Sequence, residues 1–538
     1  MRKKISIAFL WHMHQPLYKD HVSGQYFLPW VRLHATYSYL DMISMMYEFP
    51  YIKTSFNLTP SLIWQLMDIA GSEEVDDLYL NMTKKDARHL TSDEKCFILK
   101  NFFSCYPERA IYPIERYREL FFRKGTSLEK EELLKKTELF SESDFRDLQT
   151  LFNLAWCGFT MKEKDPLVKE LLQKGGGYTE DEKLSLLKRQ KDVVALILPT
   201  YKKLQDEGRI EISTSPFYHP ILPLLCKGGS EQGFDFCEDA RVQVKRAVDL
   251  YEEVFGRKPR GMWPSEGAVS PEIIPILADE GIKWAATDEA ILLESLKDKR
   301  FSRGQLIYKT FTASEAGREI DMVFRDVNIS NAISFSYSNM SAEDASMDLF
   351  NNKVRIKWAM EAQKGDHIAA IILDGENPWP YYPNGGKDFL SRTYELLSSY
   401  RAVETVTIGE YLESHKERIK IKKLAPGSWI NRNFDKWIGS PQKNMAWECL
   451  KKTREYLFSL GRPPREALEE LYIAEGSDWF WWYDEFGSEV NFVFDDLFRM
   501  HLANVYRLTG KEVPDNLTVP LFGLTQEVME RKHRAEMA

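Results

Sequence analysis

The chain has 538 residues, enough for two or three domains or for one large α/β barrel with an appended domain. Hydrophobic residues make up 43% of it and charged residues 28%, a globular composition without the bias of a disordered chain. The formal net charge is −9 and no long run of Lys and Arg occurs, which argues against a nucleic-acid partner. The aromatic content of 13% instead favours a groove for a neutral, ringed ligand.

The N-terminus, MRKKISIAFLW, has a basic start followed by an apolar run. The run is short, continues into His12 and offers no small-residue cleavage site, so we interpret it as a first β-strand rather than a signal peptide. No segment approaches the ~20 uninterrupted apolar residues of a membrane span. The six cysteines form no CxxC pair, which argues against a zinc ribbon or a dense disulfide framework. We therefore expect a reducing, cytoplasmic compartment.

Short apolar or β-branched runs recur along the chain, separated by helical patterns. Strands that alternate with helices predict a parallel sheet, either open and doubly wound or closed into a barrel. The expected strands are residues 4–11, 51–58, 209–215, 260–263, 282–288, 320–326, 367–374 and 403–408.

Two long stretches are mostly helical in pattern. Residues from about 60 to 208 separate the second and third strands, too long a connection for one crossover, so we expect an inserted helical subdomain within a catalytic unit of residues 1–415. In one helix of this insertion Thr179 and Glu182 match a capping box, and Gly208 stands where the helix should stop. Residues 416–538 are expected to form a C-terminal helical domain.

Polar, titratable side chains follow almost every expected strand. In parallel α/β folds the loops after the carboxyl ends of the strands meet at one face and build the active site. A single acid after a strand is equally well explained as a helix N-cap or a turn former, so the argument depends on the recurrence. The residues concerned are His12, His14, Gln15, His219, Glu266, Asp288, Glu289, Arg325, Asp326, Asp374, Glu376 and Asn377.

Two carboxylates stand out, Glu266 in WPSEG (263–267) and Asp374 in LDGENPW (373–379). Each lies near glycine, which lets the backbone approach a ligand, and near tryptophan, which can offer a face to a sugar ring. Two carboxylates brought together from different strands are what cleavage of a glycosidic bond needs. One protonates the leaving oxygen, and the other attacks the anomeric carbon or activates water.

His12 and His14 leave a second interpretation open. A His-x-His pair after a first barrel strand suits a metal-dependent hydrolase, in which imidazoles and a carboxylate hold a catalytic cation. Of the ten histidines only His219 follows a later strand in a comparable way, so the ligand set is incomplete and we predict no metal and no organic cofactor. Packing without function is a third interpretation, and it suits His12 better than His14.

Five motifs, in order along the chain, resemble glycoside hydrolase family 57, the α-amylase and 4-α-glucanotransferase family. They are HQP at 14–16, EISTSPFYHPILPLL at 211–225, GMWPSEGAVS at 261–270, IILDGENPWPYYPNGG at 371–386 and AEGSDWFWW at 474–482. Supporting matches such as GSWI at 427–430 extend the likeness over nearly the whole chain. The resemblance implies a (β/α)7 barrel, an incomplete relative of the TIM barrel, followed by a helical bundle that lends residues to the active-site groove.

By position, the resemblance also implies a retaining mechanism with Glu266 as nucleophile and Asp374 as general acid/base. The implied substrate is an α-1,4-glucan or maltooligosaccharide, with α-amylase-like hydrolysis expected and 4-α-glucanotransfer as the alternative. Glu211 is a further candidate for an orienting group, and burial is an equally good interpretation for each tryptophan. The implied substrate-binding residues are His12, His14, His219, Trp263, Asp288, Arg325, Glu376, Trp379 and Trp479.

One departure is Pro380, because the amylase-like branch that the chain most resembles commonly carries an acid after DGENxW. Loss of that carboxylate bears on a subsite and on specificity, since Glu266 and Asp374 are both present. A non-catalytic glucan-binding relative is therefore a third hypothesis beside the glycosidase and the metal-dependent hydrolase. Binding of glucans without turnover would distinguish it.

Overall fold

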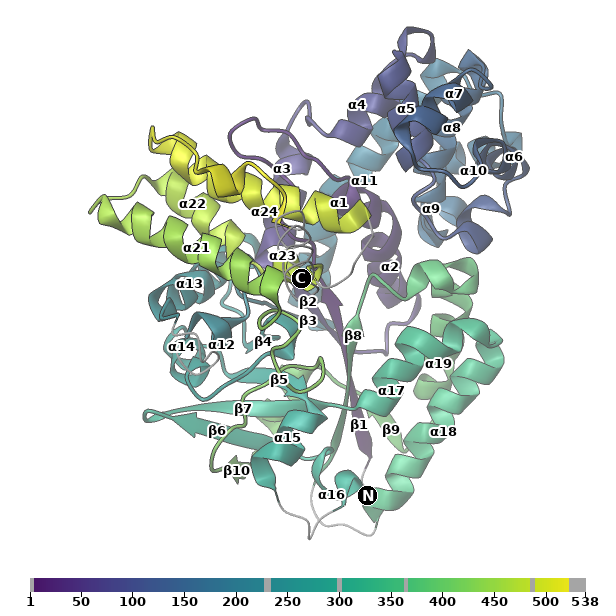
Figure 1. Cartoon of the computed structure of the whole chain (residues 1–538). Helices are drawn as coiled ribbons and strands as arrows, with labels where there is room; N and C mark the ends of the chain where they lie inside the picture. The colour runs from purple at the N-terminus through teal and green to yellow at the C-terminus, as the bar shows by residue number, and fades with distance from the viewer. Residues whose placement is uncertain (1–3, 227–233, 298–301, 362–365, 484–488, 522–538) are drawn as a thin grey trace, which may run out of the picture.

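The structure is a computed structural model that describes residues 4–226, 234–297, 302–361, 366–483 and 489–521 (Figure 1). Within these residues, seven parallel strands close into a barrel. In ring order they are β1 (Ile5–Met13), β2 (Thr54–Leu58), β3 (Ile210–Ser213), β4 (Gly261–Met262), β5 (Trp284–Asp288), β7 (Arg318–Arg325) and β8 (Ile368–Asp374).

Two neighbouring strand pairs in the ring, β3 with β4 and β7 with β8, are each joined by the backbone pairing of a single residue pair. Between β3 and β4, Thr214 pairs in parallel with Met262, and the Trp263 amide donates to the Thr214 carbonyl over 3.0 Å. Between β7 and β8, Arg325 pairs with Ala370. β1 pairs in parallel with both β2 and β8, so the sheet returns on itself. The predicted (β/α)7 barrel is thus confirmed.

Three further strands lie outside the ring. β9 (Val403–Thr405) runs parallel to β1, β6 (Phe311–Glu315) forms an antiparallel hairpin with β7, and β10 (Ile419–Ile421) runs parallel to β6. The sequence predicted β9, at residues 403–408, but neither β6 nor β10. Both are short and partly exposed, so they lack a continuous apolar run. The sheet therefore continues past residue 415, where we had expected the helical domain to begin.

The barrel interior is filled by alternate residues of its strands. Along β1, Ala8 and Leu10 belong to a small inner cluster, whereas Trp11 packs outwards with the large cluster under the helices. Because side chains alternate along a strand, His12 is the next residue of β1 after Leu10 on the inward-facing side. It lies at the carboxyl end of the barrel. The other end is closed by α20 (Ile408–Ser414), whose apolar residues join the inner cluster.

Glu211 lies near this closed end. Its carboxylate accepts hydrogen bonds from the Gly409 amide over 2.7 Å and from the Trp284 indole over 3.1 Å, and burial raises its pKa. Glu211, predicted as an orienting group, is thus bound to α20 and β5. It is the second of the four residues of β3.

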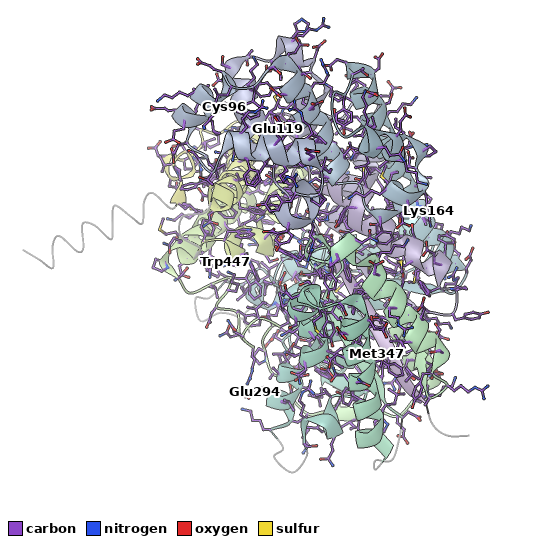
Figure 2. All side chains as sticks on the ribbon, turned by 90° about the vertical axis from the view of Figure 1, so that its right-hand side faces the viewer. Cys96, Glu119, Lys164, Glu294, Met347 and Trp447 are labelled. Carbon is purple, nitrogen blue, oxygen red and sulfur yellow. A yellow bond between two sulfur atoms is a disulfide. The ribbon has the colours of Figure 1, made fainter. Side chains whose placement is uncertain are left out.

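The chain between β2 and β3 forms a helical lobe, blue in Figure 1 and at the top of Figure 2, where Cys96 and Glu119 mark it. The predicted capping box is confirmed at Thr179, which exchanges hydrogen bonds with Glu182. The helices of this insertion are α3 (Pro60–Gly71), α4 (Leu78–Lys84), α5 (Ser92–Asn101), α6 (Glu115–Lys124), α7 (Lys130–Thr137), α8 (Glu142–Ala155), α9 (Phe159–Lys164), α10 (Pro166–Lys174) and α11 (Glu180–Asp206).

The remaining helices surround the barrel or stack beside its open end. Those of the barrel are α1 (Trp30–His34), α2 (Leu40–Glu48), α12 (Leu222–Leu225), α13 (Cys237–Phe255), α14 (Ile273–Asp279), α15 (Glu289–Leu296), α16 (Arg303–Leu306), α17 (Val327–Asn331), α18 (Ala342–Glu361) and α19 (Lys387–Ser399). The C-terminal bundle, yellow-green in Figure 1, contains α21 (Pro441–Ser459), α22 (Arg465–Ala474), α23 (Ser477–Trp481) and α24 (Glu489–Leu508).

Two findings bear on the expected compartment. Cys226 and Cys237 form a disulfide, with Cα atoms 4.6 Å apart, so the expectation of a reducing compartment gains no support from the structure. The spacing of the cysteines gave no sign of this single link. Among the described residues, none of the helices has the length and apolar character required to cross a membrane.

Candidate active site

The open end of the barrel carries a ring of polar side chains set by strand register. On β8, Ala370 lines the barrel interior, and Asp374, four residues further and in the same phase, ends the strand. The same alternation brings His12, Asp288 and Arg325 to the opening from β1, β5 and β7. The strands therefore deliver four of the predicted site residues to one place.

A cavity of about 860 Å³ lies over this opening, a size typical of ligand sites. Loops after the strands form one side of it, and the bundle with the segment before it forms the other. The residues that line it include His12, His14, Gln15, Tyr18, Glu266, Asp288, Leu293, Arg325, Asn331, Phe335, Asp374, Glu376, Asn377, Trp429, Trp437, Ser477, Asp478, Trp481 and Trp482.

Glu266 lies on a short turn after β4, η5 (Ser265–Gly267), with a backbone φ of 58°. This left-handed conformation costs a non-glycine residue about 1 kcal/mol or more, so its surroundings must hold it. Trp429 does so at both ends: its backbone amide donates to the Glu266 carbonyl over 3.0 Å, and its indole donates to Glu266 Oε2 over 2.8 Å. The Glu266 carboxyl is thereby fixed in the cavity wall.

Asp374 faces the same cavity from β8. Its Oδ2 accepts a hydrogen bond from the Asn377 side chain over 2.9 Å, and the Arg325 guanidinium lowers its pKa. Burial has the larger effect and raises the pKa of Asp374. Burial also raises the pKa of Glu266, to about 8, and repulsion from the Asp374 charge contributes to the rise. The two carboxyl groups are close enough to repel, so the pair retains a proton near neutral pH.

His12 is held as a neutral imidazole. Burial and the neighbouring His14 lower its pKa to about 3. The Asn57 amide group donates to the Thr214 carbonyl over 2.7 Å, so its Oδ1 is the acceptor for His12 Nδ1, 2.7 Å away. This network assigns the His12 proton to Nδ1 and leaves Nε2 as an acceptor for a ligand hydroxyl.

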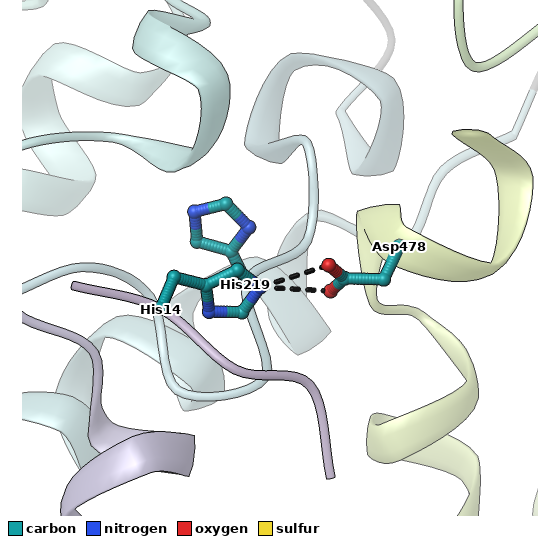
Figure 3. A group of neighbouring side chains, drawn as sticks. All are labelled: His14, His219 and Asp478. Carbon is teal, nitrogen blue, oxygen red and sulfur yellow. Dashed lines mark hydrogen bonds and ion pairs between the residues drawn. The ribbon is translucent and has the colours of Figure 1, made fainter. Parts of the chain in front are cut away.

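His14, His219 and Asp478 form a second cluster, with Asp478 supplied by α23 of the bundle (Figure 3). His14 Nε2 lies 2.9 and 3.0 Å from the two oxygens of Asp478. The His219 ring stacks on His14 with centroids 3.8 Å apart, and its Nδ1 lies 3.0 Å from Ser477 Oγ. Burial lowers the pKa of His219, so it too is neutral. The bundle is thus joined directly to the opening of the barrel.

The same cluster tests the metal interpretation. Among the described residues, His14, His219 and Asp478 are the group whose nitrogen and oxygen atoms lie within 4.8 Å of one another. The two rings are stacked at an interplanar angle of 24°, so their in-plane lone pairs run side by side instead of converging. A tetrahedral cation needs convergent ligands, so the arrangement favours a hydrogen-bonding cluster.

The comparisons with known proteins bear on this site. A family model, described as glycosyl hydrolase family 57, matches residues 8–422. The chain belongs to glycosyl hydrolase family 57. Solved structures agree on the fold: a branching enzyme from Thermococcus kodakaraensis has a TM-score of 0.62 at 16% identity, covering 95% of this chain and 93% of that one. The α-amylase AmyC from Thermotoga maritima has a TM-score of 0.58 at 15% identity, covering 95% of each chain.

Curated family 57 relatives match over shorter regions. The 1,4-alpha-glucan branching enzyme of Thermococcus kodakarensis is 40% identical over 360 residues, which cover 53% of this chain and 51% of that protein. Alpha-amylase 1 of Dictyoglomus thermophilum is 29% identical over 89 residues, 16% of this chain and 12% of that protein. The chain thus spans about half or less of the length of these two relatives.

In this family 57 chain, the three tryptophans predicted to bind substrate lie behind the cavity surface. Trp263, Trp379 and Trp479 are each at most 1% exposed and are not among the residues that line the cavity. The indoles of Trp379 and Trp479 donate to the backbone carbonyls of Gly375 and Ile473. They buttress the loops that carry the site, which is the burial interpretation that the sequence left open.

Glu376 lines the cavity but is almost fully buried, and His219 lies behind the cavity surface. Glu376, 3% exposed, accepts hydrogen bonds from the His14 amide over 2.9 Å, from the Gln15 side chain over 2.5 Å and from the Tyr39 hydroxyl. It therefore holds the loop after β1 in position. His219 is fully buried beneath His14 and 4.0 Å from Glu266 Oε1.

Several cavity residues were missed. From AEGSDWFWW only Trp479 is predicted to bind substrate, but Trp479 is buried, whereas Asp478, Trp481 and Trp482 line the cavity. Trp429 lay in the GSWI match and was not considered as a site residue. Phe335 lies outside all five motifs, and nothing in its local sequence distinguishes it.

Proposed function

We propose that this family 57 protein cleaves α-1,4-linked glucans or maltooligosaccharides with retention of configuration. The observation that carries the proposal is the pair of half-buried carboxyls, Glu266 and Asp374, which line one cavity of about 860 Å³ and repel one another. The activities of two relatives, a 1,4-alpha-glucan branching enzyme and an alpha-amylase, support an α-glucan substrate. The polar floor and aromatic walls of the cavity suit a chain of sugars.

In the first step Asp374 donates its proton to the glycosidic oxygen while Glu266 attacks the anomeric carbon. The carbon–oxygen bond to the leaving sugar breaks, and a glycosyl ester with Glu266 forms. In the second step the Asp374 carboxylate takes a proton from water, or from a hydroxyl of another sugar, whose oxygen attacks the same carbon. The ester bond breaks, and Glu266 and Asp374 return to their starting states.

These roles require a charged Glu266 and a protonated Asp374. Burial raises the pKa of both groups, and the Asp374 charge raises the pKa of Glu266 further. In the site without substrate, the two carboxyl groups therefore compete for one proton. The Trp429 indole lowers the pKa of Glu266 and so favours its anion. A bound glycosidic oxygen accepts a hydrogen bond only from protonated Asp374, so substrate binding favours the reactive arrangement.

The imidazoles would bind the sugar at the cleavage point. His12 Nε2 is an acceptor for a hydroxyl, and His14 and Asp478 present a donor and acceptor pair beside it. Asp288 and Arg325, 3.4 Å apart, also line the cavity. We propose that these charged groups orient the next sugar in the chain.

The proposed outcome is α-amylase-like hydrolysis. A 4-α-glucanotransferase is the second candidate, because Phe335 is 73% exposed at the edge of the cavity and could hold an acceptor sugar in competition with water. Product analysis with maltooligosaccharides of one defined length separates the two. Shorter products alone indicate hydrolysis, whereas products longer than the starting material indicate transfer.

Activity of Glu266→Gln tests the chemistry itself. We expect loss of turnover by at least about a thousandfold with substrate binding retained, since the variant lacks a nucleophile but keeps the shape of the site. The matched control is Glu253→Gln, an exposed position on α13. Wild-type turnover in Glu266→Gln would refute the assignment, and unaltered turnover combined with a stoichiometric bound cation would support the metal-dependent hydrolase.

A further inference from the structure

A second, smaller cavity lies where the helical insertion meets the loop after β8. It has a volume of about 80 Å³, room for a few waters or one tetrahedral oxyanion. Tyr37, Tyr106 and Trp156 form aromatic walls, and Pro380 and Asn384 close it from the β8 loop. None of these residues belongs to the catalytic cavity.

Two cationic side chains face this cavity, Lys162 of α9 and Arg109 of η3 (Pro107–Ile111). No Asp or Glu is among the described residues that line it. Arg109 donates through Nε to the Tyr381 carbonyl over 3.2 Å, and the described residues offer no hydrogen bond or ion pair to Lys162. Two positive charges, the exposed Arg109 and the half-buried Lys162, thus line one small cavity without a carboxylate in its wall.

The carboxylate whose charge acts on Lys162, Asp41, is already bound to backbone amides. Asp41 accepts hydrogen bonds from the amides of Phe159 and Thr160, each over 2.8 Å, at the start of α9. Burial lowers the pKa of Lys162, although the Asp41 charge acts in the opposite sense. A buried ammonium is stabilised when an anion comes within hydrogen-bond distance, so a ligand would supply what the protein lacks here.

We propose that this cavity is a binding site for a phosphate group, held by Lys162 and Arg109. An arginine fork combined with a lysine point charge is a common protein solution for phosphate, and the volume admits one such group. The site lies outside the catalytic cavity and is independent of the proposed glucan cleavage. Its aromatic walls would accommodate a phosphate that is either free or carried by a sugar.

A bound phosphate would link the insertion to the loop that follows Asp374. Arg109 already bonds the Tyr381 carbonyl, and the Tyr37 hydroxyl donates to the Trp379 carbonyl over 3.4 Å. On the other side, α9 is joined to α19 by an ion pair between Glu163 and Lys387. In Figure 2, Lys164 marks this junction between the blue lobe and the green helices.

The test is calorimetric titration of the full chain with inorganic phosphate at constant ionic strength, with chloride as the competing salt. The variants are Lys162→Met, which removes the charge and keeps the stem, and Arg109→Gln. The matched control is Lys164→Met on the same helix, whose ammonium pairs with Glu48 outside the cavity. Because removal of a buried charge is tolerated when the stem still packs, Lys162→Met is expected to fold.

We expect phosphate to bind the wild type and Lys164→Met equally, and Lys162→Met and Arg109→Gln at least about tenfold more weakly. Absence of binding to the wild type, or equal binding to Lys162→Met, would overturn the proposal. Titration with a hexose phosphate identifies the source of the group. Tighter binding than inorganic phosphate assigns the site to a sugar phosphate, and equal binding assigns it to the free anion. This measurement does not involve glucan cleavage, so a negative result would not affect the proposed glucan-cleaving function.

Discussion

Trp429 is the residue on which the chemistry of Glu266 depends. It binds the Glu266 backbone and one carboxyl oxygen together, and so holds a left-handed residue in one conformation. The indole hydrogen bond also lowers the pKa of a carboxyl group that burial and Asp374 raise to about 8. One side chain thus contributes both the position and the charge state of the proposed nucleophile.

Trp429→Phe should therefore impair catalysis more than substrate binding. The variant keeps most of the ring but loses the hydrogen bond that stabilises the Glu266 anion, worth about 1.5–3 kcal/mol, so kcat should fall roughly 10- to 100-fold. Because the pKa of Glu266 rises, the acid limb of the kcat/KM profile should move to higher pH. Kinetics across pH check this. Trp482→Phe, also in the cavity wall, is the control, and an unshifted limb in Trp429→Phe would argue against the assigned role.

Glu266→Gln should change how stability depends on pH. The pKa of Glu266 is raised from 4.5 to about 8 in the folded protein, so the folded state binds more protons in this window than the unfolded state. Its contribution to stability is fully present below pH 4.5 and is lost as pH rises towards 8, at up to about 1.4 kcal/mol per pH unit. Glu266→Gln has no titrating group at this position, so its free energy of unfolding lacks this decrease with rising pH.

Thermal unfolding at pH 5 and pH 8 tests this difference. The Tm of Glu266→Gln relative to the wild type should be higher at pH 8 than at pH 5, and Glu253→Gln, at an exposed position, is measured as the control. A Tm difference between Glu266→Gln and the wild type that does not change with pH would mean that the buried carboxyl titrates normally in the folded state.

At the scale of single elements, the position of a residue in its element explains which predictions held. β1 and β8 are continuous apolar runs that end in polar residues, so His12 and Asp374 could be placed at the barrel opening from their positions at the strand ends. The tryptophans could not, because Trp263, Trp379 and Trp479 lie on turns or on one short helix, where no repeat fixes the direction of a side chain. Asp478 was missed for the same reason, although its motif was recognised.

Phe335 lies on a turn that none of the five family motifs includes. Phe335 lies on η6 (Ala332–Ser336), a π-helical turn after β7, and such turns are frequent at functional sites. Its ring is 73% exposed but lines the cavity, so it offers a stacking face to a sugar outside the cleavage point.

Phe335→Ala should therefore raise KM for long maltooligosaccharides roughly 5- to 50-fold, with a smaller effect on the shortest substrate that is cleaved. If transfer occurs, the yield of longer products should fall as well. Steady-state kinetics over a series of chain lengths check this. Phe122→Ala, an exposed phenylalanine on α6 outside the cavity, serves as the control, and equal loss on short and long substrates would contradict a role at an outer subsite.

At the scale of the whole molecule, the site exists only where barrel and bundle meet. His14 bonds Asp478, and the Ser477 amide donates to the His219 carbonyl over 3.1 Å, so residues more than 250 positions apart share one cluster. The strand pattern predicted a parallel sheet, and the family resemblance specified a barrel and implied the proposed catalytic roles of Glu266 and Asp374. It could not specify this junction or the phosphate-sized cavity, because long-range packing leaves no local periodicity.

The proposed retaining mechanism requires a covalent bond between Glu266 and the anomeric carbon of the sugar. An activated glycosyl fluoride incubated with Asp374→Asn should form the ester, because its fluoride leaves without protonation, and should then persist because no base activates the second step. Peptide mass spectrometry should find one added glycosyl group on the peptide that contains Glu266. An adduct on a different residue, or steady release of product without any adduct, would contradict the account.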